Sequence, residues 1–205
     1  MNVKDWFRED PLADDFVREV KATVPWLLAA VVAVIGYYGV KNYRASRKAA
    51  ASEAFVSAYT TEELEEAVSK FGGSDAGGAL KLRLAKKYFD GARYQEAMDL
   101  YASVAGDKAP DGFADIPEVG KAQCLEALGN YADALAAYES FAETNPDSYL
   151  ALSARLGSVR VLAQLGEKDK ALARLAEIKA SVKGDSMSES RVDALEDCVK
   201  RYEVK

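Results

Sequence analysis

The sequence predicts an all-α protein in which a single N-terminal transmembrane helix precedes a solenoid of about three helical hairpins and a C-terminal capping helix. Hydrophobic residues make up 49% of the 205 residues, and much of that share is alanine, which favours closely packed helices. No charged residue occurs from Ala22 to Val40. Downstream of this segment, small and large apolar residues recur with an offset of 37 residues, which is typical of repeat architectures.

A membrane anchor is predicted at 24–40, after a charged N-terminal tail at 1–23. The 17 residues of the anchor would form about 26 Å of helix, close to the roughly 30 Å of a bilayer's hydrocarbon core. Trp26 lies near one end and Tyr37 and Tyr38 lie near the other, as aromatic residues do at membrane interfaces. These features favour a single membrane-spanning helix.

Two alternatives for this segment stay open, a cleaved signal peptide and a buried core helix. A signal peptide typically has a short basic region before the apolar run, whereas here a long charged tail precedes it and basic residues follow it. A core helix normally has one polar face, and this segment has none. Charge does not orient the anchor, because four basic residues lie on each side: Lys4, Arg8, Arg18 and Lys21, then Lys41, Arg44, Arg47 and Lys48.

Residues 41–77 are predicted to form a helical stem that ends in a Gly-rich linker. Thr60 followed by Glu63 fits a capping box that would start a new helix running to Phe71. The segment GGSDAGG that follows contains no Lys-Ser/Thr pair and follows no strand, so it is a linker and not a phosphate-binding loop.

Three hairpins are predicted across 78–185, in units of about 78–114, 115–151 and 152–185. Small residues at the helix crossings would allow close backbone approach, and large residues one turn further on would fill the space between hairpins. A compact residue is needed at each turn. The positions that carry this pattern are Ala85 and Ala97, Ala122 and Ala134, and Ala171 at the crossings, Tyr88, Tyr101, Leu125 and Tyr138 between hairpins, and Gly129 and Gly166 at the turns.

The last segment, 186–205, is predicted to be a capping helix. Val192, Leu195, Val199 and Tyr202 share one helical face, and charged residues occupy the rest. A solenoid needs such an end, because its last hairpin otherwise exposes an apolar face.

The composition excludes several classes of chemistry. With no histidine in the chain, Ser-His-Asp and Cys-His catalysis are excluded and the commonest metal ligand is missing. The net charge of −6 argues against a nucleic-acid-binding protein. We therefore predict no enzyme activity, no metal and no cofactor. Cys124 and Cys198 are expected to be buried, inert thiols, with a disulfide or a reactive thiol as the alternatives.

Two segments resemble the tetratricopeptide repeat: LGNYADALAAYESFAETNP at 128–146 and LAKKYFDGARYQEAMDLY at 84–101. The resemblance implies that the first helix of each hairpin lines a concave face that binds a partner segment. The alternative is that this face is only the surface of the array. The residues expected on it are Leu82, Lys86, Phe89, Asp90, Val119, Gln123, Glu126, Leu156, Arg160 and Gln164.

A clamp for a C-terminal carboxylate, which some members of this family have, is not expected here. Four of the five positions that correspond to the basic and amide residues of such clamps hold other residue types in this chain. These five positions are Leu82, Lys86, Gly120, Ser153 and Gly157.

The order of tail, anchor, aromatic and basic exit segment and compact repeat domain resembles the YfgM-type ancillary subunits of the bacterial SecYEG translocon. That resemblance implies an inner-membrane protein with a cytoplasmic tail and a periplasmic repeat domain. It also implies translocon subunits and the membrane-anchored chaperone PpiD as partners. The alternative function is assembly of another envelope or secretion complex, with the repeats in the cytoplasm. The sequence does not indicate an oligomeric state.

Overall fold

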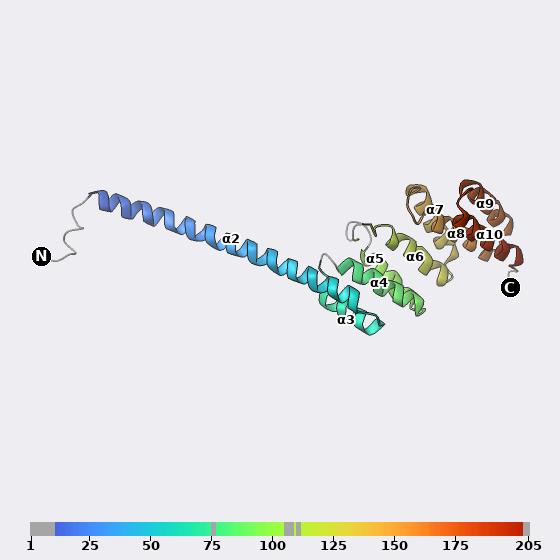
Figure 1. Cartoon of the computed structure of the whole chain (residues 1–205), viewed down its shortest axis with the longest axis horizontal. Helices are drawn as coiled ribbons and strands as arrows, with labels where there is room; N and C mark the ends of the chain where they lie inside the picture. The colour runs from blue at the N-terminus through green and yellow to red at the C-terminus, as the bar shows by residue number, and fades with distance from the viewer. Residues whose placement is uncertain (1–10, 75–76, 105–108, 110–111, 203–205) are drawn as a thin grey trace. The chain divides into compact units, whose positions relative to one another are not determined.

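The computed structural model describes the chain except residues 1–10, 75–76, 105–108, 110–111 and 203–205. The first part of the charged tail and the last residues of the capping segment therefore lie outside the described residues. The described residues form helices and no strands (Figure 1). They divide into two compact units, Met1–Ala49 and Ala50–Lys205.

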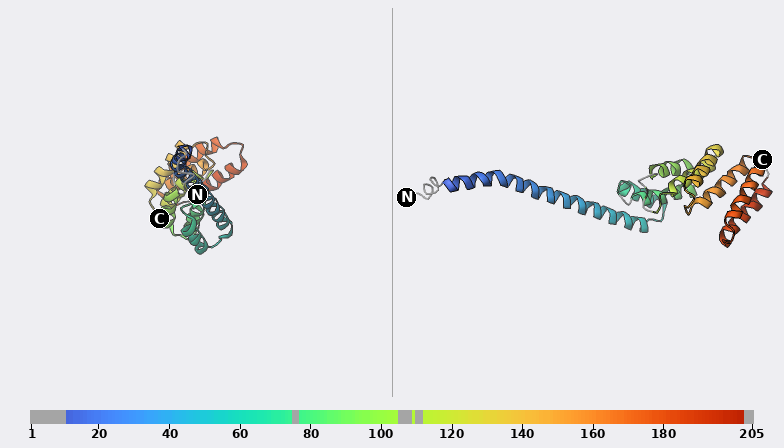
Figure 2. Two further views of the ribbon diagram at one scale, coloured as in Figure 1. Left: turned by 90° about the vertical axis from the view of Figure 1, so that its left-hand side faces the viewer. Right: turned by 90° about the horizontal axis from the view of Figure 1, so that it is seen from above.

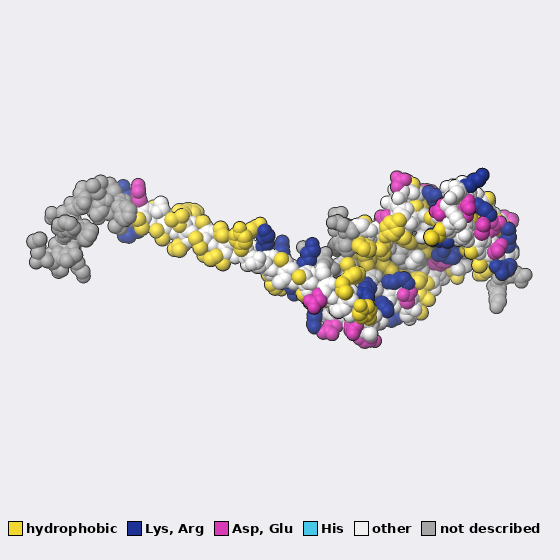
Figure 3. All heavy atoms as spheres, in the orientation of Figure 1, with side chains coloured by type: hydrophobic (Ala, Val, Ile, Leu, Met, Phe, Trp, Pro, Cys, Tyr) yellow, Lys and Arg dark blue, Asp and Glu magenta, His cyan; other side chains and the backbone are white. Residues whose placement is uncertain are grey.

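The first unit consists of most of helix α2, which runs from Pro11 to Ser57. Within it, Arg18–Ser57 is long and apolar enough to cross a membrane, judged by length and composition. Its large hydrophobic side chains between Val20 and Tyr43 are all exposed, and Trp26 is 78% exposed (Figure 3). The core-helix alternative is therefore wrong, because no part of the apolar stretch is buried in the protein. A membrane anchor and a signal sequence both fit this observation.

The second unit begins with the end of α2 and with α3, Thr61–Phe71, which starts at the predicted capping box. The Thr60 hydroxyl accepts a hydrogen bond from the Glu63 N–H at 3.2 Å, and the Glu63 carboxylate accepts one from the Thr60 N–H at 3.1 Å. The predicted capping box is therefore confirmed. Ala51, Leu64 and residues of the next helix share one buried cluster, so this segment is part of the core and not a free stem.

Three antiparallel hairpins follow, and consecutive helices pack on one another along the chain (Figure 2). They are α4 (Gly77–Asp90) with α5 (Tyr94–Val104), α6 (Ile116–Ala127) with α7 (Tyr131–Thr144), and α8 (Ala151–Gln164) with α9 (Lys168–Ser181).

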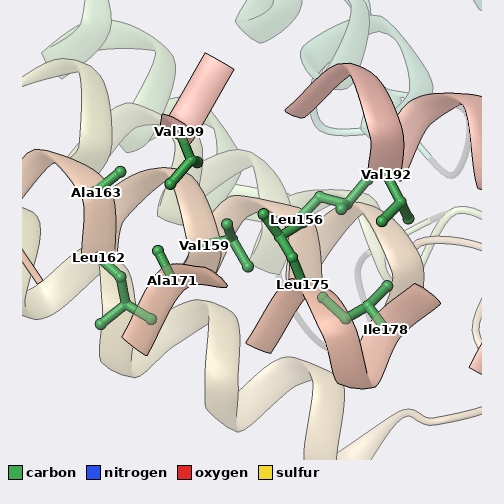
Figure 4. Packing of buried hydrophobic residues seen from close by; sticks show 9 residues of the cluster. All are labelled: Leu156, Val159, Leu162, Ala163, Ala171, Leu175, Ile178, Val192 and Val199. Atoms are coloured by element: carbon green, nitrogen blue, oxygen red, sulfur yellow. The ribbon is translucent and has the colours of Figure 1, made fainter. Parts of the chain in front are cut away.

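The helix crossings follow the predicted pattern. Ala85 and Ala97 are fully buried in the first hairpin, and Ala122 and Ala134 are fully buried in the second. In the third hairpin, Val159 stands in the place of one alanine and is fully buried beside Ala171 (Figure 4). Small side chains let the two backbones of each hairpin approach closely, which is why alanine recurs with the repeat.

Each hairpin turn uses a residue with positive φ. The φ angles are 58° at Ala92, 81° at Gly129 and 81° at Gly166, three positions spaced by 37 residues. At the first turn, the Ala92 N–H donates to the Phe89 carbonyl and the Arg93 N–H donates to the Tyr88 carbonyl, which is a Schellman motif. The other two turns have the same two hydrogen bonds. Ala92 therefore carries a left-handed conformation that glycine adopts at lower cost.

A tyrosine against a glycine joins neighbouring hairpins. A methyl group added at Gly120 would lie 2.7 Å from the ring of Tyr101, and one added at Gly157 would lie 2.6 Å from the ring of Tyr138. Both tyrosines are buried. The 37-residue offset places Leu175 and Ala194 at the corresponding positions of the last hairpin and α10.

Helix α10, Ser186–Arg201, closes the array. Asp185 caps it by accepting hydrogen bonds from the backbone N–H groups of Met187 and Ser188. Val192 and Val199 point into the cluster formed with α8 and α9 (Figure 4). The predicted capping helix is confirmed, with its apolar face on the last hairpin and its charged residues outside.

The first prediction concerns the turn residue Ala92. A non-glycine residue in the left-handed region costs roughly 1–2 kcal/mol, and the greater flexibility of glycine in the unfolded chain offsets part of the gain. We expect Ala92→Gly to raise the free energy of unfolding by about 0.5–1 kcal/mol. Gly129→Ala should lower it by about 1 kcal/mol. Denaturant titration of the full chain in detergent, followed by circular dichroism, measures both; a loss of stability in Ala92→Gly would contradict the assignment.

The second prediction concerns the contact between Tyr101 and Gly120. Gly120→Ala gains up to about 1 kcal/mol of helix propensity but overpacks the buried ring, which costs about 1–3 kcal/mol. We therefore expect a net loss of stability. The loss should shrink in the presence of Tyr101→Leu, which introduces the residue type found at Leu175. Additive effects in this double-mutant cycle would mean that the two residues do not touch.

Candidate functional site

The candidate site is a groove of about 420 Å³ between the first helices of the first two hairpins, α4 and α6. Hydrophobic side chains gather over these helices on the face shown in Figure 3. Leu82, Val119 and the ring of Tyr101 lie in its lining together with Gly120, where the bare backbone leaves room. Its remaining lining residues are Phe55, Ala79, Arg83, Lys86, Phe113, Ile116, Gln123, Tyr149 and Leu150.

Four of the residues expected on the partner-binding face line this groove: Leu82, Lys86, Val119 and Gln123. Sequence reasoning missed its aromatic rim. Phe113 and Tyr149 are exposed and lie in the loops just before α6 and α8, and Phe55 comes from the end of α2. The available signal for these two residues was a large aromatic residue in the loops before the second and third hairpins.

The charges at the groove are basic. The Arg83 guanidinium lies 5.3 Å from the ring centre of Phe55 and 5.5 Å from that of Tyr59, and it donates a hydrogen bond to the Phe55 carbonyl. Lys86 forms an ion pair with Asp90 one turn along α4. No acidic side chain belongs to the groove lining among the described residues. The groove therefore combines an apolar floor with the amide of Gln123 and two cations, of which Lys86 is already paired with Asp90.

Glu126 and Arg160, both expected on the partner-binding face, bind one another. Two hydrogen bonds of 3.0 and 2.9 Å join the Arg160 guanidinium to the Glu126 carboxylate. The hydroxyl of buried Tyr138 donates to the same carboxylate at 2.8 Å. Burial opposes the charge of Arg160, but Glu126 outweighs it, so the pKa of Arg160 is raised. Burial and the negative charge of Glu126 raise the pKa of Tyr138 far above its usual value.

The other expected face residues lie in separate places. Leu156 is buried in the core of the last hairpin, and Phe89 packs against Tyr94 with their ring centres 5.3 Å apart. Gln164 and Arg160 line a smaller cavity of about 220 Å³ beside α10. The structure therefore gathers part of the predicted face into one groove and leaves the rest in contacts within the array.

A second groove of about 420 Å³ lies between α7 and α9 and is polar. The Arg174 guanidinium on its wall binds Glu139 at 3.0 Å, and Glu177 lies 4.0 Å from the same guanidinium. Arg174 is therefore paired with one carboxylate of α7 and one of α9.

The described residues contain no cluster of three or more His, Cys, Asp or Glu side chains that could hold a metal ion. Cys124 is buried, as expected, and burial raises the pKa of its thiol to about 11. Cys198 is exposed, so the expectation of a buried thiol there is wrong. It is adjacent to Val199 on α10, just outside the face that packs on the last hairpin. Both cysteines are free, so the disulfide alternative is also wrong.

The third prediction concerns Glu126. Glu126→Gln removes the charge that balances Arg160 and weakens the hydrogen bond from Tyr138. A hydrogen bond to a charged group contributes about 1.5–3 kcal/mol, and the 39% exposure of the Arg160 side chain reduces the loss. We expect a decrease of about 1–2 kcal/mol in the free energy of unfolding, measured by denaturant titration. Glu143→Gln, at an exposed position, is the control and should have no measurable effect.

The fourth prediction concerns the two thiols. At neutral pH, a thiol with a pKa of about 11 stays protonated, and Cys124 is in addition shielded from solvent. A thiol-specific reagent should therefore modify Cys198 in the folded protein and both cysteines after denaturation. Cys198→Ser should abolish labelling of the folded chain. Rapid labelling of the folded Cys198→Ser variant would contradict the burial of Cys124.

Comparison with known proteins bears on the second half of the array. A family model described as tetratricopeptide repeat matches residues 125–189, which extend from the end of α6 into α10. No curated protein and no solved structure matches the chain significantly. The helical hairpins are consistent with a solenoid of this type. The family match and the hairpin array together support a tetratricopeptide-repeat protein.

Proposed function

We propose that this chain is a non-enzymatic, membrane-anchored scaffold that binds a partner protein in the groove between α4 and α6. The observation that carries this proposal is the groove itself, which exposes aromatic and aliphatic side chains on a folded array. Phe113 and Tyr149 are 46% and 64% exposed at its rim, although burial of large aromatic rings is strongly favourable. Concave, mostly apolar sites with a few polar groups are the usual form of binding sites.

The proposed location is the bacterial inner membrane, with α2 as the anchor and the repeats in the periplasm. The proposed partners are subunits of the SecYEG translocon and a membrane-anchored chaperone. This finer assignment is supported by the resemblance in segment order, together with an apolar helix that is long enough to span a bilayer. The alternative is a factor that assembles another envelope or secretion complex.

The fifth prediction tests the groove and the partners together. A photo-reactive amino acid at Phe113 should crosslink the full chain to a partner in native membranes, whereas one at Lys183, in the turn before α10, should not. Ile116→Ser combined with Tyr149→Ser should abolish the Phe113 adduct without loss of helicity, because both side chains line the groove. Equal adducts from Phe113 and Lys183 would contradict the groove assignment.

Mass spectrometry of the adduct decides between the two functions. Translocon subunits or a membrane-anchored chaperone would support the first proposal, and components of another envelope complex would support the alternative. A reporter enzyme that is active on one side of the membrane, fused to the C-terminus, would establish on which side the repeats lie.

A further inference from the structure

We infer that the basic stretch of α2 at 41–48, directly after the apolar segment, binds the phosphate headgroups of anionic phospholipids. The inference rests on the proposed role of α2 as a membrane anchor, and it goes beyond the binding of a partner in the groove. It follows from the charge, the spacing and the place of four basic residues: Lys41, Arg44, Arg47 and Lys48.

Positive charge is concentrated in this stretch without an acid nearby in the chain. No Asp or Glu occurs between Glu19 and Glu53. In the charged tail at 1–23, by contrast, six acidic residues accompany the four basic ones. Figure 3 shows Lys and Arg side chains gathered on the helix just beyond its hydrophobic part. The stretch after the apolar segment is therefore basic, whereas acids outnumber the bases before it.

Three of the four basic residues share one face of the helix. Lys41, Arg44 and Lys48 follow one another at spacings of three and four residues within the continuous helix Pro11–Ser57. Tyr37 precedes Lys41 by four residues, so it lies on the same face, and it is 65% exposed. This face thus changes from aromatic to basic where the apolar segment ends. The same order of groups suits a membrane interface, where rings lie at the headgroup level and long basic side chains reach the polar layer.

Two cations of this face lack a partner within the described part of the chain. Lys41 and Arg44 are exposed, and their side chains form no ion pair or hydrogen bond with another described residue. The Arg47 guanidinium donates a hydrogen bond of 3.2 Å to the Tyr43 hydroxyl, one turn closer to the apolar segment. Helical side chains lean toward the N-terminus of their helix, which here is the direction of the proposed membrane. The charges of Lys41 and Arg44 are therefore directed toward the bilayer without an acceptor from the described residues.

The place of these cations favours a lipid headgroup as the ligand over an acidic protein. A helix rises about 1.5 Å per residue, so Lys41 and Arg44 lie within about 6 Å of Val40, the last residue of the proposed anchor. The headgroup layer extends roughly 5–7 Å beyond the hydrocarbon core on each side of a bilayer. Arg47 and Lys48 lie about 10–12 Å from Val40, which is within about one Debye length of that layer. Lipid phosphates surround the helix at this depth, whereas a protein would first have to displace them.

The experiment measures which lipid surrounds this end of the anchor in the full chain. Trp6→Phe, Trp26→Phe and Tyr37→Trp together leave one tryptophan, beside the basic stretch. The chain is reconstituted in phosphatidylcholine vesicles that contain the same minor fraction of either brominated phosphatidylglycerol or brominated phosphatidylcholine, which quench tryptophan on contact. We expect phosphatidylglycerol to associate at least about fivefold more strongly, because one cation near an anionic surface contributes a factor of about that size.

Three pairs of substitutions in this background test which residues cause the preference. Lys41→Gln with Arg44→Gln should remove most of it. Lys41→Arg with Arg44→Lys keeps the charge and should retain it, because the attraction depends on charge. Lys87→Gln with Lys183→Gln is the matched control, since it removes two positive charges from exposed positions of the second unit, and it should leave the preference unchanged.

Two solution conditions identify the source of the phosphate. The preference should fall as sodium chloride is raised, because salt screens exposed charges. Inorganic phosphate at the same ionic strength should lower it no further, because a free anion lacks the acyl chains that hold a headgroup at this depth. A further loss in inorganic phosphate would indicate a site for the free anion and would overturn the assignment to a lipid.

The outcomes separate this inference from the proposed anchor. Equal quenching by the two brominated lipids, or a preference that persists in Lys41→Gln with Arg44→Gln, would overturn the inference and leave the anchor standing. Absence of quenching by either lipid would mean that this end of α2 does not contact the bilayer and would count against both.

Discussion

The array depends on the packing of a tyrosine ring from one hairpin against a glycine backbone of the next. Tyr101 and Tyr138 each occupy the space that a side chain at Gly120 or Gly157 would fill. The contact buries a large ring, fixes the distance between successive first helices and places the tyrosine hydroxyl between them. Helix spacing, the position of the groove and the polar network of the second interface all follow from this one contact.

The same contact has different consequences at the two interfaces because the neighbouring residues differ. At Tyr138, Glu126 and Arg160 complete a hydrogen-bonded group and the first helices are tied together. Beside Tyr101, the places of Glu126 and Arg160 are taken by Phe89 and Gln123. The helices there are joined by apolar packing, and a groove stays open beside the tyrosine ring. One interface thus has a polar network between its helices, and beside the other a groove stays open.

Much of the fold could be predicted from local sequence. The offset of 37 residues located the crossings at Ala85, Ala122 and Ala134, and Thr60 with Glu63 marked the start of α3. These features are local or periodic, so sequence alone specifies them. Ala92 was missed as a turn residue, because alanine gives no signal for a left-handed conformation that the neighbouring hairpins impose. The exposed thiol of Cys198 was missed because it borders the buried face of α10.

The sequence by itself determined the succession of an apolar helix and an alanine-rich repeat, since hydrophobic length and periodicity depend only on the order of residues. The sequence could not determine which polar residues of the first helices would form ion pairs and hydrogen bonds with one another inside the array. Glu126 and Arg160 lie 34 positions apart and meet only because α6 and α8 are held side by side. Phe55, Phe113 and Tyr149 likewise reach one groove from three separate segments. Tertiary packing decided the site, because contacts between side chains distant in sequence exist only after the helices have stacked.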